Sequence, residues 1–188
     1  AWVQSKSRRM PHSPDPPHEH YGTLVRTARS LQENGLIVMA AADFDFREIT
    51  YNWHQHLTRL GISNALVLAM DRELAAELTR RRIPNVENAA NTDAWNKTCL
   101  QRHIQRVRTE RQLAVCALLL AGLDVLHTDV TVVMLRNVLP MLRSSPPYAS
   151  ADFLVQREGG PGGAYKKIGS CVNPGFMYAR GAHTEEAR

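Results

Sequence analysis

In the first part of the chain, short runs of apolar residues alternate with segments of helical spacing. Residues 36–40 and 65–70 are continuous apolar runs, as expected for strands buried on both faces of a parallel sheet. Between them, apolar residues recur at the spacing of a helix and stop at Gly61, a common type of helix terminator. This helical stripe consists of Ile49, Trp53, Leu57 and Leu60. The pattern predicts a strand, a helix and a second strand, in that order.

The alternation continues after the second run. Residues 71–82 have helical spacing, and Pro84 marks the end of that helix. A longer helix is predicted for about residues 95–121, whose apolar stripe ends before Gly122. A third apolar run, residues 123–127, follows at once and predicts a third strand.

Three further apolar runs, separated by proline and glycine clusters, predict additional strands at residues 132–135, 153–155 and 176–178. Strands that alternate with helices predict an α/β fold, with a mainly parallel, Rossmann-like sheet covered by helices on both faces. Sheets of this kind bind ligands beyond the carboxyl ends of their strands. Functional side chains are therefore expected just after each strand.

The two ends of the chain differ from its middle. Residues 1–22 are rich in proline and histidine, a composition that predicts a linker or stem. Residues 23–188 are predicted to form one domain. The chain begins with Ala1 and stops after residues 181–188 without a closing element, so we interpret the domain as partial and truncated at its C-terminus.

Composition narrows the class of protein. With 188 residues and 44% apolar residues, the chain can form a sizeable core. No apolar window of about 20 residues occurs, so any membrane anchor is expected outside this chain. The three cysteines form no CxxC pair, which argues against a zinc module and a disulfide framework. The tripeptide Asn96-Lys97-Thr98 fits the N-glycosylation pattern of a lumenal protein.

The charge of the chain is moderately basic, with a formal net charge of +5. Such a charge suits a nucleic acid, an anionic membrane or a phosphorylated small molecule. Arg102, Arg106 and Arg108 on the long predicted helix are the main support for a nucleic-acid-binding domain. Because no aromatic residues interleave with these arginines, we expect no nucleic-acid partner.

Two common phosphate-binding motifs are absent. The residues after the first strand are Ala41, Ala42 and Asp43, which excludes the GxGxxG motif of dinucleotide-binding domains. The glycine-rich residues 159–163 lack the spacing of a P-loop. Acidic or amide side chains instead follow several strands: Asp43, Asp71, Asp129 and Asn173.

The third strand carries a family resemblance. Residues 122–140 read GLDVLHTDVTVVMLRNVLP. This passage resembles the nucleotide-diphospho-sugar transferase family, glycosyltransferase family 77, in which a short apolar strand precedes an Asp-Val-Asp motif. Residues 52–62, 66–71 and 173–178 resemble further passages of the family, in the family's order. The resemblance covers roughly residues 36–182.

The resemblance implies a GT-A fold and a retaining glycosyltransferase that takes a UDP-sugar donor. It implies transfer of arabinose or xylose to a cell-wall glycan or glycoprotein, by a type II membrane protein of the Golgi lumen. It also implies a divalent cation, Mn²⁺ or Mg²⁺, because a metal held by carboxylates can stabilise a departing diphosphate.

Carried over to this sequence, the resemblance assigns the metal to Asp129, and it assigns catalytic roles to Asp129 and Asn173. The expected donor-binding residues are Ala41, Ala42, Asp43, Asp71, Arg111, Asp129, Val130, Thr131 and Gly175. Structural roles compete with several of these assignments. Asp71 can cap a helix, Asp129 can make a turn hydrogen bond, and the Asn-Pro-Gly sequence at residues 173–175 can form a simple turn.

The sequence departs from the family at the second acid of the Asp-x-Asp motif, where Thr131 stands. A neutral hydroxyl is a weaker metal ligand than a carboxylate. Three options follow: weakened use of a metal, catalysis without a metal, or a non-catalytic homologue that acts as a binding or scaffolding module.

Arg111 interrupts the apolar stripe of the long predicted helix. An arginine that faces the protein interior needs an anionic partner. The diphosphate of a nucleotide donor is one candidate, because a guanidinium group can bind it through two hydrogen bonds. An Asp of the same chain or the carbonyls of a helix end are the alternatives.

Overall fold

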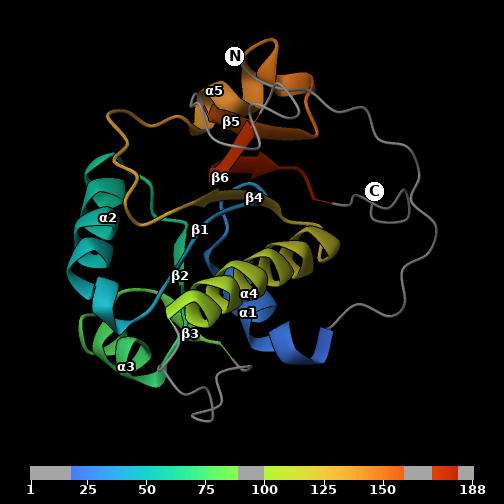
Figure 1. The fold of residues 1–188 in the computed structure, drawn as a ribbon. Coiled ribbons are helices and arrows are strands. Elements are labelled where there is room, and N and C mark those ends of the chain that lie inside the picture. Colours follow the sequence, from blue (N-terminus) through green and yellow to red (C-terminus); the bar gives the residue numbers. More distant parts are fainter. Residues whose placement is uncertain (1–17, 89–99, 159–170, 182–188) are drawn as a thin grey trace.

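The computed structural model describes residues 18–88, 100–158 and 171–181 of the chain. In this part of the chain, six strands form one sheet in the order β3-β2-β1-β4-β6-β5 (Figure 1). The strands are β1 (Leu36–Ala42), β2 (Ala65–Ala69), β3 (Asn85–Glu87), β4 (Asp124–Thr128), β5 (Phe153–Glu158) and β6 (Cys171–Ala179). β1 pairs in parallel with β2 and β4, and β2 pairs in parallel with β3. β6 runs antiparallel to both β4 and β5.

Within the described residues, five α-helices and two short 3-10 helices surround the sheet. The α-helices are α1 (His18–Leu31), α2 (Arg47–Arg59), α3 (Arg72–Arg80), α4 (Leu100–Leu120) and α5 (Leu139–Ser144). The 3-10 helices are η1 (Phe44–Phe46) and η2 (Tyr148–Ser150). Apolar residues of α2, α3 and α5 pack on one face of the sheet, and those of α1 and α4 pack on the other. The predicted α/β fold, with helices on both faces, is therefore confirmed.

The burial pattern explains why these segments form strands. Every residue of β2 and β4 is buried, as is all of β1 except Ala41, because helices cover both faces of these strands. Successive side chains of a strand point to opposite faces of the sheet, so Val38 packs in one core cluster and Met39 in the other. Continuous apolar runs are the pattern that such a doubly covered sheet requires.

The order of the strands creates a binding position. β1 lies between β2 and β4, so the chain leaves β1 toward one side of the sheet and later returns to its other side. In an open α/β sheet, this reversal leaves a crevice outside the carboxyl ends of the two strands. Here it opens between Asp43, after β1, and Asp129, after β4.

Two predictions about local structure are wrong. Residues 132–135 form no strand although they lie in the described part of the chain, and the side chain of Leu135 is 92% exposed. β4 is already paired with β1 and β6 on its two sides, and the chain turns away where Val132 N–H donates to the Asp129 carbonyl at 3.0 Å. The linker predicted through residue 22 is also too long, because α1 begins at His18 and Tyr21 is buried.

Other boundaries differ by a few residues or fall on residues that are not described. The helix predicted for residues 71–82 ends at Arg80, and Arg82 has a positive φ of 59°. The predicted start of the long helix at residue 95, the glycosylation tripeptide and the glycine-rich residues 159–163 lie outside the described residues. Within the described part of the chain, no helix combines the length and the apolar character needed to cross a bilayer.

Candidate functional site

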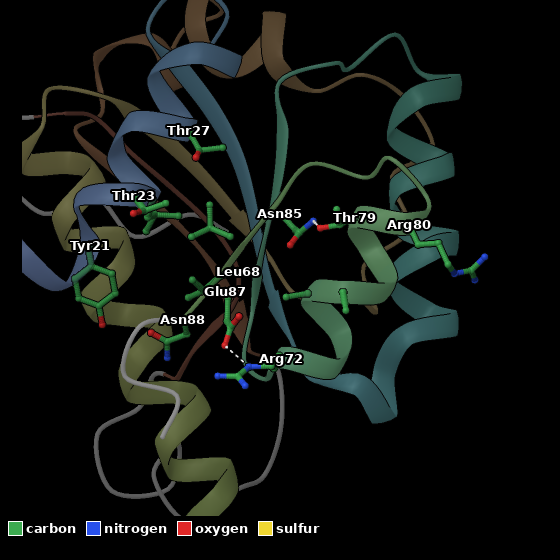
Figure 2. Close-up of a pocket in the computed structure, with 14 residues that line it drawn as sticks. Tyr21, Thr23, Thr27, Leu68, Arg72, Thr79, Arg80, Asn85, Glu87 and Asn88 are labelled. Atoms are coloured by element: carbon green, nitrogen blue, oxygen red, sulfur yellow. Dashed lines mark hydrogen bonds and ion pairs between the residues drawn. The ribbon is translucent and has the colours of Figure 1, made fainter. Parts of the chain in front are cut away.

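One cavity of the protein does not contain the predicted site. It has a volume of about 750 Å³ and lies at the outer edge of the sheet, between α1, α3 and β3 (Figure 2). Its polar side chains pair with one another, as Arg72 does with Glu87 at 3.6 Å and Asn85 with Thr79 at 3.2 Å. Most of the expected donor-binding residues line a different cavity.

A second cavity, of about 350 Å³, occupies the crevice at the carboxyl ends of β1 and β4. Its lining residues come from β1 and η1, from α4, and from the turn after β4: Ala41, Ala42, Asp43, Asp45, Phe46, Val107, Arg108, Arg111, Asp129, Val130 and Thr131. All the expected donor-binding residues except Asp71 and Gly175 are in this set. Three segments that lie far apart in sequence therefore meet where the alternation of strands and helices predicts a ligand.

An ion pair between Arg111 and Asp129 forms one wall of this cavity. The Arg111 Nη1 donates to the Asp129 Oδ1 at 2.8 Å. The Arg111 side chain is only 9% exposed, whereas that of Asp129 is 44% exposed. The alternative of an intramolecular partner for Arg111 is thus confirmed, and the partner is itself an expected site residue. Among the described residues, the buried Arg111 Nε has no hydrogen-bond partner, so this guanidinium retains a donor.

Gly175 supports Asp129 from β6. The Asp129 N–H donates to the Gly175 carbonyl at 2.8 Å, and the Gly175 N–H donates to the Asn173 Oδ1 at 2.8 Å. A Cβ atom at position 175 would lie 2.6 Å from the Asp129 Oδ2 and 2.9 Å from the Asn173 Oδ1. Only glycine therefore allows the Asp129 carboxylate to pack against this backbone. Asn173 lies beside Asp129 in this arrangement, but it does not line the cavity.

His127 lies behind Asp129 in β4 and is fully buried. Its Nδ1 lies 3.1 Å from the Met39 carbonyl oxygen, within hydrogen-bond distance. Its Nε2 faces the Asp129 Oδ1 at 3.7 Å. Burial lowers the pKa of His127, so the ring is neutral near pH 7. His127 therefore faces the Asp129 side chain and is not among the residues that line the cavity.

The pKa of Asp129 is lowered, first by its interaction with His127 and further by Arg111. Burial acts in the opposite direction but does not prevail. The carboxylate is therefore ionised at neutral pH, and together with the Arg111 guanidinium it places two opposite charges at the cavity wall.

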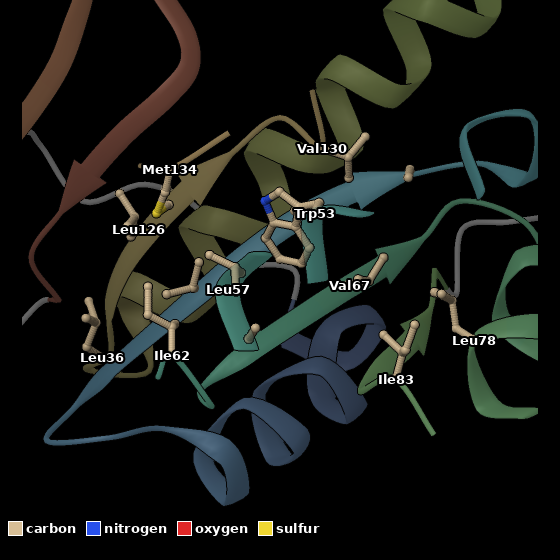
Figure 3. Packing of buried hydrophobic residues seen from close by; sticks show 14 of the residues in the cluster. Leu36, Trp53, Leu57, Ile62, Val67, Leu78, Ile83, Leu126, Val130 and Met134 are labelled. Atoms are coloured by element: carbon tan, nitrogen blue, oxygen red, sulfur yellow. The ribbon is translucent and has the colours of Figure 1, made fainter. Parts of the chain in front are cut away.

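The Asp129 turn is also held by α2, which lies on the face of the sheet opposite α4. The indole Nε1 of Trp53, in α2, donates to the Oγ1 of Thr128 at 2.8 Å, and both side chains are buried. Trp53 belongs to the same apolar cluster as Val130 (Figure 3). The Asn52-Trp53 passage thus contributes to the site by fixing the end of β4, which its helical spacing alone did not indicate.

Asp71 lies outside the cavity, so its assignment to the donor pocket is not met. Its Oδ1 accepts from the Leu74 N–H at 2.7 Å and caps α3, and its Oδ2 accepts from the Phe44 N–H at 2.9 Å. Both oxygens are therefore committed to the backbone. Asp71 still influences the cavity, because η1, which it holds through Phe44, provides the lining residues Asp45 and Phe46.

Four lining residues were not among the predicted site residues: Asp45, Phe46, Val107 and Arg108. Helical spacing could have indicated two of them, because Val107 and Arg108 lie one turn before Arg111 on α4. Asp45 and Phe46 follow the first strand directly, but no periodic signal marks η1.

Comparison with known proteins supports the same interpretation. A family model described as nucleotide-diphospho-sugar transferase matches residues 60–186. The arabinosyltransferase XEG113 of Arabidopsis thaliana is 24% identical over 143 residues, which is 76% of this chain and 22% of that protein. The β-arabinofuranosyltransferase RAY1 of the same plant is 29% identical over 122 residues, which is 61% of this chain and 22% of that protein.

The chain thus spans about a fifth of the length of these two relatives. No solved structure shows a significant match to it. The matched residues include β4, the Asp129 turn and β6, and the cavity lies at the carboxyl ends of β1 and β4, where open α/β sheets bind ligands. The chain belongs to the nucleotide-diphospho-sugar transferase family.

Proposed function

We propose that this chain forms the donor-binding part of a glycosyltransferase that takes a UDP-sugar. The observation that carries the proposal is the buried Arg111 guanidinium, which pairs with Asp129 in a cavity at the carboxyl ends of β1 and β4. In the reaction, the bond between the anomeric carbon and the diphosphate oxygen breaks. An acceptor hydroxyl forms a bond to that carbon and loses its proton.

The charges of the cavity suit the two ends of such a donor. A diphosphate carries concentrated negative charge, which the guanidinium of Arg111, a lining residue of the cavity, would attract. The Asp129 carboxylate can accept hydrogen bonds from the hydroxyls of the ribose or the sugar. The Thr131 hydroxyl can donate hydrogen bonds to these hydroxyls or accept them. Ala41 and Ala42 leave space for the flat face of the base at the end of β1.

The names of the relatives guide the choice of sugar and acceptor. Both are described as arabinosyltransferases, so we propose arabinose as the first sugar to test and xylose as the second. We further propose retention of the anomeric configuration, a cell-wall glycan or glycoprotein as acceptor, and a position in the Golgi lumen. In this view, a membrane anchor and the acceptor site lie in parts of the protein beyond this chain.

A second candidate function is that of a non-catalytic binding or scaffolding module. Thr131 favours it, because this residue stands where the family motif has its second carboxylate. The two candidates differ in the assembled protein, since only an enzyme releases UDP from a UDP-sugar when the acceptor is present.

Isothermal titration calorimetry with UDP tests the shared step. We expect UDP to bind, and to bind more tightly than UMP, because UMP lacks the second phosphate. Val107→Trp should fill the cavity and abolish UDP binding. Leu120→Trp is the matched control, because Leu120 is 51% exposed and lies about 20 Å further along α4. Equal binding of UDP to both variants, or no binding to the wild type, would contradict the proposal.

A further inference from the structure

We infer that Arg111 takes the place of the divalent cation at this donor site, so that UDP binding requires no metal. This inference rests on the proposed function. It goes further by naming the group that neutralises the charge of the diphosphate. It departs from the expectation of Mn²⁺ or Mg²⁺ that the family resemblance raises. Three features of the cavity carry it.

The first feature is the state of the Asp129 carboxylate. Its Oδ1 accepts a 2.8 Å hydrogen bond from Arg111, and the Nε2 of His127 faces the same oxygen at 3.7 Å. Its Oδ2 is packed against Gly175, where even an added Cβ atom would come within 2.6 Å. The Oδ1 is therefore paired with a cation of the protein, so a metal at Asp129 would have to compete with Arg111 for the charge of this carboxylate.

The second feature is the set of ligands that the cavity offers. Mg²⁺ and Mn²⁺ select carboxylates and other hard oxygen ligands. Asp43, Asp45 and Asp129 line the cavity, but within the described residues no three side chains of His, Cys, Asp or Glu come together as a metal site. Thr131 supplies only a neutral hydroxyl where the family motif has a carboxylate.

The third feature is the position of the positive charge. The Arg111 guanidinium is fixed by burial on α4 and by its ion pair, so it already occupies the immediate neighbourhood of Asp129. A divalent cation bound to the same carboxylate would be repelled by this guanidinium at close range. A fixed guanidinium that lines the cavity provides a positive charge for a diphosphate.

The test is UDP binding by calorimetry, in buffer with EDTA and in buffer with MnCl₂. We expect the wild-type chain to bind UDP with the same affinity in both. Arg111→Gln should weaken binding by about tenfold or more in both buffers, and Arg111→Lys, which keeps the charge, should lose less. Arg59→Gln is the control, because this exposed arginine lies at the far end of α2 from the cavity.

The outcomes separate the inference from the proposed function. If UDP binds only with Mn²⁺, or if Arg111→Gln binds UDP as well as the wild type in EDTA, the inference is wrong and the donor site stands. If UDP binds in neither buffer, both are wrong. The comparison of the two buffers uses the wild-type chain alone, so the inference can be decided even where an Arg111 variant does not fold.

Discussion

The indole Nε1 of Trp53 donates a hydrogen bond of 2.8 Å to the hydroxyl of Thr128, the residue immediately before Asp129. Trp53 is 2% exposed and Thr128 is fully buried, so this bond connects the core of α2 to the end of β4 without access of water. The orientation of the Asp129 turn therefore depends on a residue on the opposite face of the sheet, 75 positions earlier in the chain.

Thr128→Val removes the acceptor of this bond while keeping the shape of the side chain. The buried indole N–H is then left unpaired, which costs about 1–3 kcal/mol of the free energy of unfolding. Urea denaturation measures this loss. Thr58→Val is the control, because Thr58 is an exposed residue of α2 and a change there should stay within about 0.5 kcal/mol. Equal stability of the two variants would show that the Trp53 hydrogen bond contributes nothing.

Gly175→Ala should impair UDP binding more than it impairs stability. The added methyl group would lie 2.6 Å from the Asp129 Oδ2, so the carboxylate must move and its ion pair with Arg111 must change. Calorimetry with UDP and a thermal unfolding curve measure the two effects separately.

The control for this change is Gly22→Ala in α1, where the new methyl group meets only the flexible end of Arg26, at 3.4 Å. Replacing a helical glycine by alanine stabilises a helix by up to about 1 kcal/mol, so this variant should be at least as stable as the wild type. If Gly175→Ala binds UDP like Gly22→Ala, the close contact between Gly175 and Asp129 has no role in the site.

Asp71→Ala should lower stability and also loosen the cavity. The substitution removes the cap of α3, a loss of about 0.5–2 kcal/mol, and it frees the Phe44 N–H at the start of η1. Glu73→Ala, an exposed change in the same helix, is the control for an altered charge. We expect weaker UDP binding only for Asp71→Ala. Unchanged UDP binding in that variant would show that the position of η1 does not affect the donor site.

Ionisation of Tyr178 should lower the free energy of unfolding at alkaline pH. Burial, together with the charge of Asp124, which accepts from the phenol at 2.9 Å, raises the pKa of Tyr178 to about 12. The folded state thus holds this proton more tightly than the unfolded chain, in which a tyrosine pKa is about 10. The stabilisation is complete below pH of about 10 and is lost as the pH rises through about 12.

Tyr178→Phe removes this titration, so the free energy of unfolding should fall less steeply with pH in the variant than in the wild type. Urea denaturation at pH values from neutral to alkaline measures the two slopes, and the other tyrosines contribute equally to both proteins. Parallel slopes would contradict the assignment of the shifted pKa to Tyr178.

The sheet could be predicted from the sequence because strands covered on both faces leave an unambiguous apolar run, as β1, β2 and β4 do. The pairing of Arg111 with an acid was open to prediction for a similar reason, since a charge on an apolar stripe requires a partner. The apolar run at residues 132–135 was misleading, because sequence pattern does not show that both sides of β4 are already occupied.

Helix α1 was missed although Tyr21, Leu24 and Ala28 lie on one helical face and are all buried. The histidines and prolines before them dominate the local composition and concealed the spacing. The contacts of Gly175 and Trp53 with the Asp129 turn join residues far apart in sequence, so no local pattern could reveal them.

Hydrogen exchange measured by mass spectrometry, with and without UDP, tests the location of the donor site most directly. UDP should slow exchange of the backbone amides after β1, at residues 41–46, and after β4, at residues 129–132, because these segments line the cavity. The amides of residues 72–88, around the larger cavity between α1, α3 and β3, should exchange at an unchanged rate. Slower exchange at residues 72–88, with none after β1 and β4, would contradict the account.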